Sequence, residues 1–137
     1  MTPAELKADA DRARHEGRLD VAEESLRQAI AILRTQGDSL ALAHTIRHLG
    51  DLHRHTGNVA QATSCCAEAL NLYRRFEGMA AQLDVANAIR SMALVSEMSG
   101  DTDRARALWQ EAKTLYSSCR VDSGIAESTS RLASLSS

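Results

Sequence analysis

The sequence is poor in aromatic residues and has a single proline. Phe, Trp and Tyr make up 3% of its 137 residues, and Pro3 lies near the start. With so few aromatics, a core must be built from Ala, Leu, Ile, Val and Met, which suits helices packed closely through small residues. The first turn of a helix tolerates proline, and no other proline interrupts the chain. The composition therefore predicts an all-α fold.

A basic excess and long apolar runs are also lacking. The net charge is −2 and the pI is about 6.2, whereas a dedicated nucleic-acid binder needs a surplus of positive charge. The longest apolar run is the five residues "AIAIL", far too short for a membrane span. The opening "MTPAELKADADRARHEG" has no apolar stretch of the kind found in signal peptides. We therefore expect a cytoplasmic protein with neither nucleic acid nor membrane as partner.

Signals for catalysis and for bound cofactors are missing as well. The three cysteines, Cys65, Cys66 and Cys119, have no metal-ligand spacing, which favours reduced thiols in a helical core. No "GxSxG" occurs, and neither phosphate-loop nor dinucleotide-binding glycine patterns are present. We expect no enzymatic activity and no cofactor.

One phrase occurs three times in the chain. "GRLDVAEESLRQAI", "GNVAQATSCCAEAL" and "GDTDRARALWQEAK" begin at Gly17, Gly57 and Gly100. Alanine follows each glycine after five and after twelve residues, a larger residue after nine, and Ile or Leu after fifteen. Such steps keep the side chains on one helical face. The positions are Ala22, Ala62 and Ala105; Leu26, Cys66 and Trp109; Ala29, Ala69 and Ala112; and Ile32, Leu72 and Leu115.

The residues before each glycine repeat too. A small residue lies seven positions before it in every copy (Ala10, Gly50, Ala93), which predicts a second close helix crossing. Each unit is then a helix, a turn at glycine and a helix, with glycine at a C-terminal position that needs positive φ. Asn58 and Asp101 can cap the helices that follow two of these turns.

The copies recur every 40 and then 43 residues, and "IAESTSRLAS" adds a fourth half-copy. Periods in this range with paired helices indicate a solenoid. The predicted helices are 3–15, 18–34, 39–56, 58–76, 80–99, 102–118 and 122–135. We expect one domain over 1–137, with repeats at about 3–36, 38–77 and 79–119 and a capping half-repeat at 121–136. A native end and a truncated longer array both remain possible.

The repeated phrase resembles the tetratricopeptide repeat (TPR) family. That family's unit has leucine and a small residue in its first helix, glycine at the turn, then alanine, a bulky residue and alanine. "IRHLGDLHRHTGNVAQATSCCAEAL" and "IRSMALVSEMSGDTDRARALWQEA" follow this order. Families such as HEAT and armadillo fit the period alone. The resemblance implies a right-handed superhelical solenoid of antiparallel helix pairs.

Two departures from the family pattern stand out. The usual period is shorter, so these helices are long, as in repeats of kinesin light chains and some bacterial signalling scaffolds. Ala13, His53 and Ser96 replace an aromatic near the end of the first helix. We expect His53 to lie at a helix interface.

The resemblance also implies that the first helices line a concave, peptide-binding groove. Helical spacing independently places the second-copy residues, from His44 to His55, on one face. Lys7, Arg47 and Arg90 occupy equivalent positions and would form a row that favours a peptide with acidic side chains or a free carboxylate. The candidate peptide-binding residues are Lys7, Arg14, His44, Arg47, His48, Asp51, Arg54, Asn87, Arg90 and Arg131, and Glu97 and Glu127 would also line the groove.

Other functions remain open at this stage. His44 and His48 are spaced i, i+4 and can present two imidazoles to one metal ion, which would suit a metal-binding sensor. Short solenoids can also stack end to end, which would make the chain a self-associating structural module. A charged face can equally be solvated and bind nothing. Of these, a protein-protein interaction module is the function that we favour.

Overall fold

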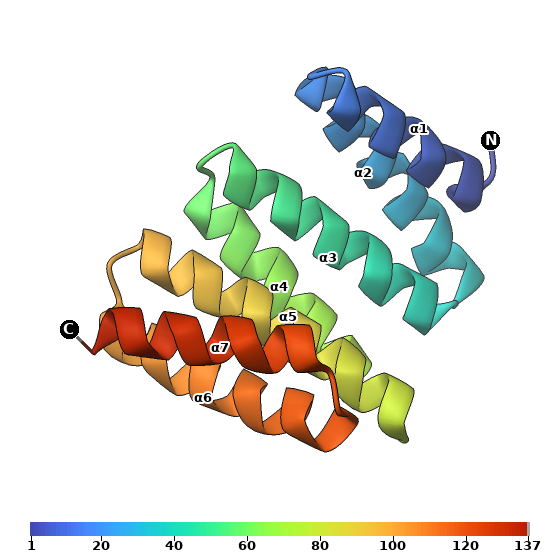
Figure 1. Cartoon of the computed structure of the whole chain (residues 1–137). Helices are drawn as coiled ribbons and strands as arrows, with labels where there is room; N and C mark the ends of the chain where they lie inside the picture. The colour runs from blue at the N-terminus through green and yellow to red at the C-terminus, as the bar shows by residue number, and fades with distance from the viewer. Residues whose placement is uncertain (137) are drawn as a thin grey trace. The chain divides into compact units, whose positions relative to one another are not determined.

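The computed structural model describes residues 1–136, which contain seven α-helices and no strand (Figure 1). The predicted all-α fold is confirmed. Six helices begin and end within two residues of their predicted limits, whereas α4 ends three residues early, because Phe76 N–H bonds to the Tyr73 carbonyl in a turn. The helices are α1 (Pro3–His15), α2 (Leu19–Gln36), α3 (Ser39–His55), α4 (Val59–Tyr73), α5 (Met79–Met98), α6 (Thr102–Cys119) and α7 (Asp122–Leu135).

The chain forms two compact units, Met1–Leu72 and Tyr73–Ser137, here called the N-terminal and the C-terminal unit. In the N-terminal unit α1 packs against α2, and α2 packs against α3. In the C-terminal unit α6 packs against both α5 and α7. Each helix runs antiparallel to the one that follows it in its hairpin, as Figure 1 shows. The repeated helix–turn–helix unit predicted from the sequence is therefore present in both units.

The turn between the paired helices has the same backbone geometry in all three copies. Gly17, Gly57 and Gly100 have φ of 76°, 81° and 79°, in the left-handed region as expected. The N–H after each glycine donates to the carbonyl five residues earlier, which satisfies a carbonyl at the helix end. These bonds are Arg18 to Ala13 (2.8 Å), Asn58 to His53 (2.8 Å) and Asp101 to Ser96 (3.0 Å).

The small residues of the repeated phrase form the innermost part of the core. All six of its alanines are at most 1% exposed, and Leu26, Cys66 and Trp109 are buried between them. The prediction for the fifteenth residue after the glycine is only partly correct, because Leu72 is buried but Ile32 and Leu115 are half-buried. The sixteenth residue is buried in every copy. It lies four residues after the twelfth, which is closer to the roughly 3.6 residues of one helical turn than a step of three. This position holds Leu33, Tyr73 and Tyr116.

Arginine–glutamate ion pairs recur at equivalent positions of successive copies. In the N-terminal unit both terminal nitrogens of Arg34 contact the Glu68 carboxylate, at 2.7 and 2.9 Å. In the C-terminal unit Arg74 lies 3.5 Å from Glu111. Each arginine is seventeen residues after its turn glycine, and each glutamate is eleven after the next one. The fork-shaped Arg34–Glu68 pair fixes direction as well as distance, so it aligns α2 with α4 within the N-terminal unit.

Gly50 marks a close helix crossing in the N-terminal unit. A Cβ built there would be 3.0 Å from the Cβ of Cys65 and 3.3 Å from the Sγ of Cys66. The backbone of α3 thus lies directly against α4, as the small-residue pattern predicts. A larger side chain at this position must push the two helices apart.

We predict that Gly50→Leu lowers the free energy of unfolding by about 3 kcal/mol through overpacking. Gly50→Ala should change it by less than about 1 kcal/mol, because better helix propensity offsets one tight contact. Urea unfolding followed by circular dichroism measures both. Ala60→Leu, on the exposed side of α4, is the matched control. Equal stability of Gly50→Leu and this control would mean that the helices do not cross here.

Candidate functional site

The candidate peptide-binding residues lie in both units, and each unit is described by itself. The N-terminal unit contributes Lys7, Arg14, His44, Arg47, His48, Asp51 and Arg54, and the C-terminal unit contributes Asn87, Arg90 and Arg131. The expected row from Lys7 through Arg47 to Arg90 therefore extends over both units and stays a prediction.

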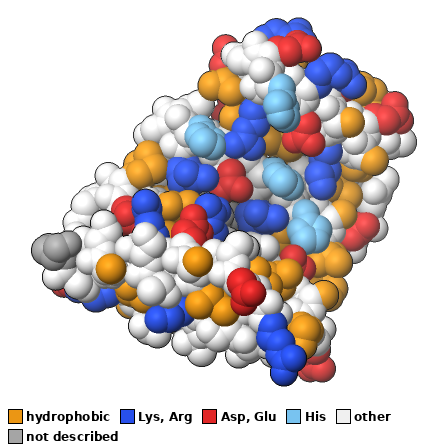
Figure 2. Space-filling view, in the orientation of Figure 1, with side chains coloured by type: hydrophobic (Ala, Val, Ile, Leu, Met, Phe, Trp, Pro, Cys, Tyr) orange, Lys and Arg blue, Asp and Glu red, His pale blue; other side chains and the backbone are white. Residues whose placement is uncertain are grey.

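In the N-terminal unit α1 and α3 bring their charged faces together. The charges of Lys7 and Asp11 on α1 act on the pKa of His48 on α3, as do those of Arg47 and Asp51 on α3 itself. Figure 2 shows basic, acidic and histidine side chains interleaved over these two helices. We call this surface, formed by the seven N-terminal candidates with Asp11 and His55, the α1–α3 face.

Positive charge predominates on the α1–α3 face. Four basic side chains, Lys7, Arg14, Arg47 and Arg54, stand against the two carboxylates of Asp11 and Asp51. Asp51 lies between two arginines, 3.8 Å from Arg47 and 3.8 Å from Arg54. These distances are too long for direct hydrogen bonds. A face with a cationic surplus, in a chain whose net charge is −2, attracts anionic groups.

Two histidines of this face, His48 and His55, are held toward their neutral form. Burial lowers the pKa of His48, and the positive charges of Arg47 and Lys7 lower it further, against the opposing carboxylates. Burial likewise lowers the pKa of His55, assisted by Arg54 and Arg14. Neutral imidazoles both donate and accept hydrogen bonds, so near neutral pH they add polar contacts to the face rather than charge.

In the C-terminal unit each candidate residue has an intramolecular partner. Arg90 of α5 binds the Glu127 carboxylate of α7 in a fork, with its Nε 2.5 Å from Oε1 and its Nη2 3.0 Å from Oε2. The Asn87 side-chain oxygen accepts a hydrogen bond from the Tyr116 hydroxyl at 2.7 Å. Sequence reasoning placed Glu127 in the groove but missed this pairing, although the 37-residue separation is close to the repeat period.

Arg131 belongs to a second network in the C-terminal unit. It lies 2.9 Å from Glu97, and its guanidinium stands over the Trp109 ring, 5.8 Å from the centroid. The Trp109 indole N–H donates to the same Glu97 at 2.6 Å. Because Trp109 is fully buried, this network couples a candidate binding residue to the core.

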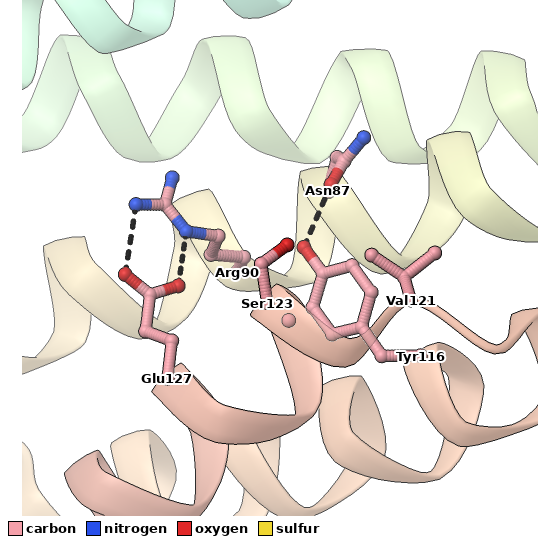
Figure 3. A pocket seen from close by; sticks show the side chains of 7 residues that line it. Asn87, Arg90, Tyr116, Val121, Ser123 and Glu127 are labelled. Atoms are coloured by element: carbon pink, nitrogen blue, oxygen red, sulfur yellow. Dashed lines mark hydrogen bonds and ion pairs between the residues drawn. The ribbon is translucent and has the colours of Figure 1, made fainter.

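A cavity of about 340 Å³ opens beside the Arg90–Glu127 pair (Figure 3). At its base α7 approaches α6 very closely: a Cβ built at Gly124 would lie 2.4 Å from the Tyr116 ring. The sequence analysis did not single out Gly124, because it stands outside the repeated phrase. The cavity is lined by Asn87, Arg90, Tyr116, Val121, Ser123, Gly124 and Glu127.

Other residues singled out from the sequence have structural roles. His53 is 2% exposed, with its Nε2 3.5 Å from the Glu23 carboxylate, so the predicted interface position is confirmed. Cys66 is buried, and burial raises the pKa of its thiol to about 12, which suits packing rather than reactivity.

Residues 1–136 contain no group of three or more His, Cys, Asp or Glu side chains that could hold a metal ion. None of the helices in this range is long and apolar enough to cross a membrane.

The profile of the tetratricopeptide repeat matches residues 41–118, more than half of the chain. The chain belongs to the tetratricopeptide repeat family. The TPR match includes α3 to α6 almost completely, and with them the second and third copies of the repeated phrase. No curated protein matches this TPR chain in sequence.

Solved structures of similar fold include repeats of the kinesin light chain type. A putative kinesin light chain from Podosopora anserina with nearly identical TPR-like repeats is 17% identical, with a TM-score of 0.80. A variant of that protein gives the same values. BtubC (BKLC) from P. vanneervenii is 16% identical, with a TM-score of 0.73. At such identities the likeness shows the fold alone.

These alignments include almost all of the TPR chain but only part of the similar structures. The alignment with BtubC contains 97% of this chain and 62% of BtubC. The alignment with the kinesin light chain contains 98% of this chain and 67% of that protein. For its variant the shares are 97% of this chain and 66% of the variant. The chain therefore spans about two thirds of the length of the structures that it resembles.

We predict that acidification destabilises the protein partly through His48. The pKa of His48 is lowered in the folded state, so below its ordinary value of 6.5 the unfolded chain takes up the proton more readily. The stabilisation is therefore complete above that value and is lost as pH falls through the folded-state pKa. Thermal melts between about pH 7 and pH 5 should show a shallower loss of stability for His48→Gln than for the parent. Parallel pH profiles would contradict this assignment.

Proposed function

We propose that this chain is a non-catalytic protein-interaction module whose α1–α3 face binds a peptide segment with acidic side chains or a free carboxylate. The tetratricopeptide repeat fold itself suggests a protein-protein interaction module. The finer proposal concerns the chemistry of the peptide and the residues that bind it. Lys7, Arg14, Arg47 and Arg54 would supply the positive charge.

The cationic surplus of the α1–α3 face is the observation that carries the proposal. Two adjacent helices contribute basic side chains to one surface, which holds twice as many basic groups as carboxylates. A peptide with negative charges would gain attraction there that a neutral or basic peptide would not. The charge pattern thus favours one chemical class of partner.

Arg54 adds a geometric argument. Its Nε is buried and has no hydrogen-bond partner, and its Nη2 is 3.8 Å from Asp51, beyond hydrogen-bond range. A guanidinium with no close carboxylate can bind one from a peptide through its two terminal nitrogens. Asp51, between Arg47 and Arg54, would then act by positioning the two arginines.

His48, whose pKa is lowered, would contribute hydrogen bonds rather than charge. His44 and His48 lie on the same side of α3 as Arg47, and both are half-buried. A neutral imidazole can donate to a peptide carbonyl or accept from a peptide N–H. Because an extended segment loses conformational freedom when it binds, we expect micromolar affinity, about −8 kcal/mol.

We predict that a fluorescein-labelled, glutamate-rich peptide binds the chain and that its glutamine counterpart does not. Arg47→Gln/Arg54→Gln should weaken binding about tenfold or more, the loss of at least one charge-assisted hydrogen bond. Fluorescence anisotropy at two salt concentrations measures the affinity. Comparing free and amidated peptide C-termini separates a terminal carboxylate from acidic side chains.

Arg75→Gln/Arg104→Gln is the matched control, since both arginines are exposed and the change in net charge is the same. Circular dichroism confirms that each variant is folded. Equal losses in the two double variants would mean unspecific attraction to the whole chain. Equal binding of glutamate and glutamine peptides would reject the acidic preference, and concentration-dependent light scattering without peptide binding would favour self-association.

A further inference from the structure

The Arg90–Glu127 pair of the C-terminal unit has the geometry of a bound ligand. The Glu127 carboxylate meets Nε and Nη2 of Arg90 along two parallel contacts, the arrangement that arginine also uses to recognise carboxylates of binding partners. In Figure 3 the two side chains point toward each other from α5 and α7. The pair shows that a carboxylate fits at this position of the C-terminal unit.

The neighbouring Glu97–Arg131 pair differs from the Arg90–Glu127 pair because it is bound to the buried Trp109. Glu97 is 20% exposed and is also held by the indole N–H of the buried Trp109, so this pair is part of the packing. Arg90 and Glu127 are 36% and 35% exposed, which leaves both within reach of a molecule in solution. Partly exposed ion pairs contribute little to stability, so little stability is lost if another carboxylate replaces that of Glu127.

Space for an incoming residue lies directly beside the pair. The 340 Å³ cavity is bounded by the Tyr116 ring and Val121 on its apolar side and offers the Ser123 hydroxyl as a polar group. In Figure 3 Ser123 lies next to Arg90, the Tyr116 ring follows, and Val121 lies beyond that ring. A peptide residue whose carboxylate replaced that of Glu127 would therefore have both a place for its backbone and a charge partner.

We infer that Arg90 is a carboxylate subsite for an acidic peptide residue, and that Glu127 of α7 occupies it as an intramolecular competitor. This inference rests on the proposed preference for acidic peptides and adds its regulation: α7 lowers the affinity of the C-terminal unit for such a segment. The chain holds a second acidic-peptide contact that its own C-terminal helix blocks.

Removal of the competing charge should strengthen peptide binding. We predict that Glu127→Gln binds the glutamate-rich fluorescein peptide about fivefold more tightly than the parent, which corresponds to one partly exposed ion pair. The same substitution in the Arg47→Gln/Arg54→Gln background should produce a gain of similar size, because Arg90 belongs to the other unit. Adding Arg90→Gln should cancel the gain in both backgrounds.

The outcomes separate this inference from the proposed function. A gain that depends on Arg90, together with no effect of Arg47→Gln/Arg54→Gln, would support the subsite and reject the α1–α3 face. No gain from Glu127→Gln, or a gain that survives Arg90→Gln, would overturn the subsite whatever the first face does. Absence of binding in the parent and in every variant would overturn both.

A second variant and a spectroscopic signal distinguish a loss of the subsite from a loss of folding. Glu127→Asp keeps the charge but is one methylene too short for the fork, so it should give a smaller gain in the same direction. The Arg90 Nε–H resonance, assigned by its loss in Arg90→Gln, should shift in Glu127→Asp and shift again when the peptide is added. A resonance unmoved by peptide in either Glu127 variant would contradict the subsite.

Discussion

The structure depends on close helix packing through residues that have almost no side chain. Ala22, Ala62 and Ala105 are sealed in the core, and Gly50 brings the backbone of α3 against Cys65 and Cys66 of α4. Small residues allow helices to approach until backbone and Cβ atoms are in contact, which gives dense packing without aromatic bulk. The turn glycines make this possible, since their positive φ reverses the chain within a few residues.

This packing determines which helix surfaces stay exposed to solvent. The small faces of the helices are used up in the core, so charged residues lie on the remaining surfaces. There arginine has two different roles. Arg34 binds Glu68 and aligns α2 with α4, and Arg74 pairs with Glu111 of α6, whereas Arg47 and Arg54 stand on the α1–α3 face around Asp51. The first two are part of the packing between helices, and the second two carry the proposed contact with a peptide.

Much of the fold and part of the candidate site could be predicted from single residues. The glycine turns, the alanine positions and the burial of His53 follow from local spacing, because each concerns one helix and its immediate partner. The sixteenth position of each copy and the contact of Gly124 with Tyr116 were not predicted. Burial at the sixteenth position depends on the helical period of about 3.6 residues, which is not a whole number. The Gly124–Tyr116 contact involves α7, which lies outside the repeated phrase. Asn87, Arg90 and Arg131 were predicted to bind a peptide, and that role stays a prediction. Their intramolecular partners were not predicted.

By itself the sequence determined the helices, their pairing at glycine and the membership of the tetratricopeptide family, because these depend on residues close together in the chain. Only the tertiary structure decided which charges meet. Arg90 and Glu127 are 37 residues apart, as are Arg74 and Glu111. No local pattern shows that the first pair lies beside a cavity and that the second joins Arg74 to α6. Coulomb energy depends on distance in space and on exposure to water, and both are set by the stacking of the repeats.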